Sequence, residues 1–188
     1  HILTLWSGIG KNGAGRDTVL LQNITHVLEQ YPVRTSVSTI YHKLEMSKEF
    51  YQQTQLTLKT GRNLYPDRTL YQADELFPLT LFTAFSDCYP IAPFIHPVMD
   101  TIYQHDKEQG TDYLNTLGVY LKCMLNSKAA AKELHIHNNT MLYRIRRIED
   151  LFGISFDNYN LLHALSCNFD LIRALGISYE EAGNRFPS

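Results

Sequence analysis

The residues best suited to chemistry lie in one stretch, ELHIHNNTMLYRIRRIEDLFG, at positions 133–153. At about 100° per residue, a helix here places Met141, Ile145, Ile148 and Phe152 on one apolar stripe, with Leu142 at its edge. The opposite face carries amide, hydroxyl, phenol and guanidinium groups, which can read base edges and hold phosphates. These groups belong to Asn139, Thr140, Tyr143, Arg146 and Arg147, with Asp150 beside them and Arg144 on the flank. The alternative is a helix whose arginines simply face solvent.

A short alanine-rich helix, which begins at Asn126 or Ser127, precedes this stretch. Ala130 and Ala131 allow close approach of another helix, and a three-residue turn follows. The pattern predicts a helix-turn-helix at about 127–152, with a recognition helix at about Asn139–Phe152 in the major groove of DNA. Lys128, Lys132 and Arg144 are expected to contact phosphate. The full set of candidate DNA-binding residues is Lys128, Lys132, His137, Asn138, Asn139, Thr140, Tyr143, Arg144, Arg146 and Arg147.

The charge distribution agrees with this prediction. The chain has a net charge of −2, but residues 122–153 hold six basic and three acidic residues, a local charge of +3. Phosphate contacts supply much of the affinity for nucleic acid, so the local charge matters more than the total.

Other motifs are weaker. Gly8–Gly13 reads GIGKNG, a literal GxGxxG after a strand-like run, but the next predicted strand ends without a carboxylate, so a surface loop is favoured over a phosphate cradle. His135 and His137 lack further ligands at metal-binding spacing, and turn or capping roles are favoured for both. No catalytic set can be assembled. We therefore expect no enzyme activity, no catalytic residues, no metal and no cofactor.

The remaining sequence predicts two parts. Residues 2–6 and 33–41 are expected to be strands, 18–30 and 47–59 helices, and 69–73 a short closing strand, which together form a small α/β layer. Ser47 is expected to cap its helix. Prolines at 78, 90, 93 and 97 indicate a connector with broken helical segments. From Val98 onward the pattern is helical, with helices at 113–125 and, as the last one, 160–175.

Composition limits the class of protein further. With 44% hydrophobic and 19% charged residues, the chain is globular, and no apolar run reaches membrane-spanning length. Three cysteines without CxxC spacing favour free thiols and a cytoplasmic location. The abrupt start on a strand-like run suggests a fragment of a longer protein.

The segment YLNTLGVYLKCMLNSKAAAKELHIHNNTMLYRIRRIEDLFG closely resembles the C-terminal helix-turn-helix of the PucR/CdaR family of bacterial transcriptional regulators. The resemblance covers roughly residues 94–175. Two departures are Asn138, where the family often has arginine, and Ala130, where threonine is common. The matching positions are Leu117, Tyr120, Leu121, Ala131, Leu134, His137, Asn139, Thr140, Tyr143, Arg144, Arg147, Ile148 and Glu149.

The N-terminal part is similar to the later half of a degenerate GGDEF-like domain, on the segment VRTSVSTIYHKLEMSKEFYQQTQLTLKTG. The chain has no Gly-Gly pair, so the resemblance implies a scaffolding or dimer-forming role and no cyclase activity. The expected fold is α+β: a partial GGDEF-like α/β domain at 1–76, a connector at 77–97 and an all-α helix-turn-helix domain at 98–188.

The expected function is that of a sequence-specific transcriptional regulator that binds double-stranded operator DNA as a homodimer. The resemblance also implies a small-molecule effector, sensed by a region upstream of this chain. The alternative is a nucleotide-sensing α/β module whose helical domain binds another protein.

Overall fold

The computed structural model describes residues 22–27, 30–31 and 33–184. It divides into two compact units, one up to Leu81 and one from Phe82 onward. The strand predicted at 2–6 and the glycine loop at Gly8–Gly15 lie outside the described residues, so the alternative role of that loop in nucleotide binding stays a prediction. Within the helix predicted at 18–30, residues 22–27 are helical.

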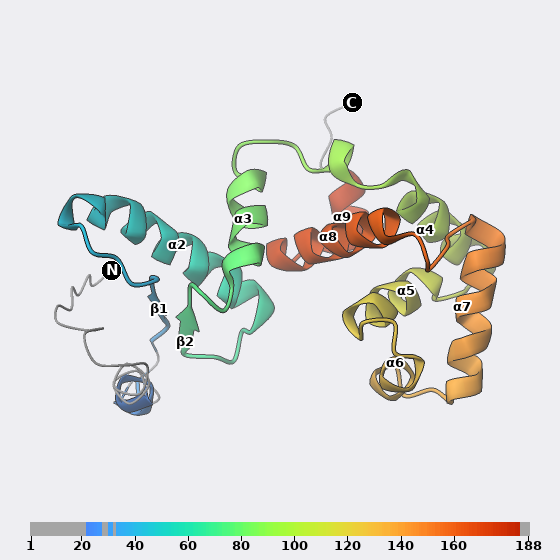
Figure 1. Cartoon of the computed structure of the whole chain (residues 1–188), viewed down its shortest axis with the longest axis horizontal. Helices are drawn as coiled ribbons and strands as arrows, with labels where there is room; N and C mark the ends of the chain where they lie inside the picture. Colours follow the sequence, from blue (N-terminus) through green and yellow to red (C-terminus); the bar gives the residue numbers. More distant parts are fainter. Residues whose placement is uncertain (1–21, 28–29, 32, 185–188) are drawn as a thin grey trace. The chain divides into compact units, whose positions relative to one another are not determined.

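The N-terminal unit contains a strand–helix–strand arrangement. Strand β1 (Thr35–Val37) pairs in parallel with β2 (Leu70–Gln72), and helix α2 (Ser47–Leu64) connects them (Figure 1). Parallel neighbours need such a crossover because a tight turn can join only antiparallel strands. Helix α2 also contacts the sheet directly, since the Ser36 hydroxyl donates a hydrogen bond to the Thr54 carbonyl at 2.7 Å.

Several predicted boundaries in this unit need correction. The strand at 69–73 is confirmed as β2, but only Thr35–Val37 of the strand predicted at 33–41 is extended and paired. Ser47 is not a cap. A short 3-10 helix, Leu44–Met46, leads straight into α2, so Ser47 already has helical backbone angles and its hydroxyl donates to the Leu44 carbonyl. Helix α2 also continues past residue 59 to Leu64.

Gly61 allows α2 to lie closely against β2. A Cβ atom at this position would come within 2.3 Å of Cδ1 of Tyr71, in the body of the ring. Tyr71 is fully buried, and its hydroxyl lies 2.9 Å from the carbonyl oxygens of both Tyr65 and Arg68. The ring is therefore anchored at its far end and has little freedom to move away.

We expect Gly61→Ala to destabilise the N-terminal unit by about 1–3 kcal/mol, because overpacking against an anchored ring outweighs the higher helix propensity of alanine. Urea unfolding followed by circular dichroism measures the change. Gln52→Ala, at an exposed position of the same helix, is the matched control and should be nearly neutral. An unchanged or higher stability for Gly61→Ala would contradict the close approach of Tyr71.

The predicted connector at 77–97 is more regular than the prolines suggested. It contains helix α3 (Phe77–Ser86) and a 3-10 helix (Ala92–Phe94), and the boundary between the two units falls within α3. Pro78 is the second residue of α3, and Pro97 is the first residue of the next helix. A proline in the first helical turn loses no internal hydrogen bond, so these prolines begin helices and do not break them.

From residue 97 the described chain is helical to residue 184, as predicted, except for short turns. The predicted helix at 113–125 ends at Lys122. It cannot continue because Met124 and Leu125 have positive φ angles of 51° and 61°. Met124, in the turn that follows, is 90% exposed. The helix predicted to be the last is followed by another. The helices are α4 (Pro97–Gln109), α5 (Tyr113–Lys122), α6 (Ser127–Glu133), α7 (Asn138–Phe152), α8 (Tyr159–Leu175) and α9 (Tyr179–Asn184).

Helices α4, α5, α6, α7 and α8 share one apolar core. Helix α5 lies at its centre and packs against α4, α6, α7 and α8. The core therefore fixes the helix pair α6 and α7 to a larger helical body. Its buried members are Met99, Ile102, Tyr113, Leu117, Ala130, Ala131, Met141, Ile145, Ile148, Ile154 and Leu165.

Candidate nucleic-acid interface

Helices α6 and α7 form the predicted helix-turn-helix. Asn126 caps α6, since its Oδ1 accepts a hydrogen bond from the Ala129 amide at 3.0 Å. Ala130 and Ala131 are buried, which lets α6 pack closely in the core. The turn spans residues 134–137 and is one residue longer than predicted; His135 reverses the chain direction with a φ of 54°. The two helices are neighbours, and Figure 1 shows α6 nearly end-on beside α7.

The ends of α7 are set by His137 and Gly153. The Nδ1 atom of His137 accepts a hydrogen bond from the Asn139 amide at 3.2 Å, so the capping role favoured for this histidine is confirmed. The helix ends at Gly153, whose φ of 64° is left-handed and suits glycine. The helix predicted at Asn139–Phe152 is thus confirmed to within one residue.

The two faces of α7 differ in burial as the sequence predicts. Met141, Ile145 and Ile148 are 0%, 6% and 0% exposed, whereas Tyr143 is 61% exposed. Leu142, at 39%, lies at the edge. The exposed polar side chains near the N-terminal end and centre of the helix are those of Asn139, Thr140, Tyr143 and Arg146.

Three of the predicted DNA-binding residues, Asn138, Arg144 and Arg147, lie nearer the protein body. Arg147 is half-buried, so it stands at the margin of the exposed face. Asn138 is also half-buried, and its Oδ1 is shielded from solvent with no hydrogen-bond partner among the described residues. This oxygen does not belong to the exposed face of α7, and the structure gives no support for it as an acceptor toward a base.

The positive charge of the segment is partly used within the protein. Lys122 makes an ion pair with Glu133 at 2.7 Å, and this hydrogen bond lowers the pKa of the Glu133 carboxyl. Arg144 lies 3.6 Å from Asp112. The other cations of the segment make no ion pair with any described residue; they are Lys128, Lys132, Arg146 and Arg147. Among the described residues of this unit, the Lys and Arg side chains without an ion pair thus lie on α6 and α7.

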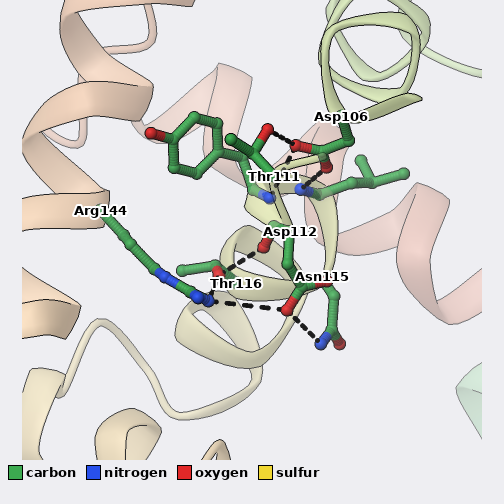
Figure 2. Close-up of polar contacts among 8 residues, drawn as sticks. Asp106, Thr111, Asp112, Asn115, Thr116 and Arg144 are labelled. Atoms are coloured by element: carbon green, nitrogen blue, oxygen red, sulfur yellow. Dashed lines mark hydrogen bonds and ion pairs between the residues drawn. The ribbon is translucent and has the colours of Figure 1, made fainter. Parts of the chain in front are cut away.

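Arg144 points toward α5 and away from the exposed face of α7 (Figure 2). Its Nη1 donates a hydrogen bond to the Thr116 hydroxyl at 3.0 Å, and its side chain is 27% exposed. The expectation that Arg144 contacts phosphate from the flank of α7 does not match this placement. Sequence reasoning missed Thr116 and Asp112, because both lie on another helix and carry no local signal of the contact.

Features of other functional classes are few in the described part of the chain. No group of three or more His, Cys, Asp or Glu side chains is placed to hold a metal ion there. None of the described helices combines the length and apolar character needed to cross a membrane. Cys88, Cys123 and Cys167 are free thiols.

Comparison with known proteins assigns the helix pair. The chain is similar to the proline-responsive transcriptional activator PutR of Bacillus subtilis, with 39% identity over 54 residues that cover 29% of this chain and 13% of that protein. It is 25% identical to the DNA-binding transcriptional activator AdeR of the same organism over 122 residues, 64% of this chain and 29% of that protein. The purine catabolism regulatory protein of B. subtilis is 37% identical over 49 residues, 26% of this chain and 9% of that protein. The chain spans less than a third of the length of these relatives. No solved structure matches the chain significantly.

The helical unit therefore contains a helix-turn-helix domain of the kind found in transcriptional regulators. Residues 113–171 match the model of the PucR C-terminal helix-turn-helix domain. The match begins with α5 and ends within α8, so it includes the α6–α7 pair and the two helices that pack beside it.

Proposed function

We propose that this protein is a sequence-specific DNA-binding transcriptional regulator in which α7 enters the major groove. The observation that carries the proposal is the set of unpaired cations on α6 and α7, next to the exposed polar face of α7, within a PucR-type helix-turn-helix. In such motifs the second helix contacts base edges while the first approaches the backbone. The relatives named as transcriptional activators support the same function.

The exposed side chains divide into two proposed roles. Asn139, Thr140 and Tyr143 on the exposed face of α7, and Arg147 at its margin, are assigned to base contacts, since they carry the donors and acceptors that such contacts need. The phosphate contacts are assigned to Lys128, Lys132 and Arg146, and to the ring of His137 at the start of α7. Such contacts position a protein on DNA without reading its sequence.

The proposal is tested by the salt dependence of binding to a random-sequence duplex. Each neutralised phosphate contributes a slope of roughly −0.9 in the logarithm of the association constant against the logarithm of salt concentration. Three or four contacts per domain therefore predict a slope of about −3 to −4 for each bound domain. An absence of binding even at low salt would reject the proposal and favour a protein-interaction role for the helical unit.

We expect Lys132→Ala to weaken binding to preferred and random duplexes equally and to reduce the salt slope by about one. The reason is that Lys132 is exposed on α6 and has no ion-pair partner among the described residues. Fluorescence anisotropy titrations at several salt concentrations provide the measurement. Lys107→Ala on α4, where the lysine is paired with Glu180 at 3.0 Å, is the control and should change neither value. A shift in base preference for Lys132→Ala would move this residue to the base-reading group.

We also propose that the regulator acts as a symmetric homodimer, because one helix-turn-helix seldom gives enough contacts for tight operator binding. Large apolar side chains exposed in the region of the predicted connector support a further contact; they include Phe77, Leu81, Tyr89 and Phe94, each 52–58% exposed. Light scattering at tens of micromolar is expected to give twice the mass of the chain. A monomer, both alone and with DNA, would contradict the dimer.

The N-terminal unit is proposed to be a non-catalytic scaffold, and the regulator is proposed to act in the cytoplasm, where bacterial DNA lies. The parallel strand–helix–strand arrangement is compatible with part of a GGDEF-like domain, and the sequence has no Gly-Gly pair for the catalytic turn of such domains. An effector for this regulator is part of the same proposal, by analogy with the family.

A further inference from the structure

Arg144 is held between two helices in a way that the other arginines of α7 are not. Its guanidinium donates to the hydroxyl of Thr116 at 3.0 Å and lies 3.6 Å from Oδ2 of Asp112, and both partners belong to the N-terminal end of α5 (Figure 2). Thr116 is fully buried. The contact therefore crosses the α5–α7 interface and ends inside the protein.

The hydrogen-bond directions in this contact are fixed by chemistry. The single proton of the Thr116 hydroxyl is donated to the Asp112 carbonyl at 2.5 Å, which leaves the oxygen free to accept. A guanidinium can only donate. Arg144 thus donates a hydrogen bond to the buried Thr116 oxygen, which would otherwise have no donor. Hydrogen bonds from charged donors are stronger and more directional than apolar contacts.

The end of α5 that receives Arg144 is itself held by α4. Asp106 accepts hydrogen bonds from the amides of Tyr113 at 2.9 Å and Leu114 at 2.8 Å, and also from the Thr111 hydroxyl (Figure 2). Asp106 caps α5 from the preceding helix. The first turn of α5 is consequently held in place by α4, and Arg144 links α7 to this turn.

We infer that Arg144 is a positioning residue, which sets the orientation of α7 on α5 and does not contact phosphate. The apolar stripe of α7 buries surface but does not by itself fix the rotation of the helix, because the hydrophobic effect is non-directional. Base reading needs side chains held within a fraction of an ångström of the productive geometry. The inference rests on the proposed DNA-binding function and names the residue that controls its specificity.

The test compares a variant that removes the Thr116 acceptor with a variant that removes the charge of Arg144. The probes are a random-sequence duplex and a duplex enriched from a randomised library with the wild-type protein. Thr116→Val keeps the shape but removes the acceptor, and the Asp112 carbonyl keeps its bond from the Thr116 amide at 3.1 Å. Thr116→Ser restores the acceptor and is the matched control. Thermal unfolding confirms that each variant is folded at the temperature of the titration.

Thr116→Val and Arg144→Ala are each expected to weaken binding to the enriched duplex by roughly ten-fold, with random-duplex binding and its salt slope unchanged. The double variant should bind the enriched duplex no more weakly than Arg144→Ala alone, because Arg144→Ala already removes the hydrogen bond that Thr116→Val removes. Thr116→Ser should bind like the wild type. The inference is overturned if Arg144→Ala weakens both duplexes equally and lowers the salt slope by about one while Thr116→Val has no effect. Failure of the wild type to bind either duplex would instead reject the proposed function, and this inference with it.

Discussion

Replacing Arg147 with alanine is expected to weaken binding to a preferred duplex by about 1–3 kcal/mol and to relax base preference at one position. Arg147 is half-buried and makes no ion pair with the described residues, so partial burial restrains the side chain while its charge has no ion-pair partner there. A restrained guanidinium loses less conformational freedom on binding and can form a bidentate contact with guanine.

The neighbouring Arg146 offers a matched comparison for Arg147. It has the same charge and lies on the same helix, but it is exposed. Arg146→Ala should weaken preferred and random duplexes to the same extent, as expected for a phosphate contact. Anisotropy titrations with both duplexes separate the two variants. Unchanged affinity and unchanged base preference for Arg147→Ala would show that α7 is rotated differently on DNA.

Ile148→Ala is expected to destabilise the helical unit by about 2–5 kcal/mol. Ile148 is fully buried in the core shared by α4–α8, and its loss leaves a cavity lined by side chains from several helices. A loss of this size is a large part of the stability of a small domain, so DNA binding at physiological temperature should fall with the folded fraction. Urea unfolding gives the free energy of unfolding directly.

Leu142→Ala is the control for Ile148→Ala, since this leucine lies on the same helix but is 39% exposed. Its replacement should cost less than about 1 kcal/mol, because much of its apolar surface is already in contact with water. Equal costs for the two variants would contradict the orientation of α7 in the core.

The helix-turn-helix could be predicted because its signals are local. The apolar stripe of α7 repeats with the helical period, Gly153 ends the helix, and Asn126 caps α6, so each boundary depends on residues close by in the sequence. The core positions of α7 followed from the same periodicity, and Met141, Ile145 and Ile148 are buried as predicted.

The direction of Arg144 could not be predicted in this way. A helical wheel gives the angle at which a side chain leaves the helix, but a long side chain then follows its tertiary partner. That partner, Thr116, is buried on α5, and nothing in the sequence around Arg144 indicates it. The capping of α5 by Asp106 was missed for the same reason, since the carboxylate comes from the preceding helix.

One missed element did have a local signal. Helix α9 begins after Ser178, whose hydroxyl accepts from the Glu181 amide at 3.2 Å while the Glu181 carboxylate accepts from the Ser178 amide at 2.7 Å. This is a capping box, with Ser and Glu three residues apart. The helix was not predicted because it is short and has little apolar periodicity.

The prolines of the connector were expected to break helices, but Pro78 and Pro97 lie in the first turns of α3 and α4. The effect of a proline depends on its position within the helical turn, and the residue type alone does not reveal that position.

The most direct test of α7 as a major-groove reader is a dimethyl sulphate protection experiment on an enriched duplex. The reagent methylates guanine N7 in the major groove and adenine N3 in the minor groove, so the two grooves are reported separately. We predict that the wild-type protein protects guanine N7 atoms in each half-site, and that Arg147→Ala loses protection at one of them. Protection confined to adenine N3, or no protection of guanine N7 at a saturating protein concentration, would contradict the placement of α7 in the major groove.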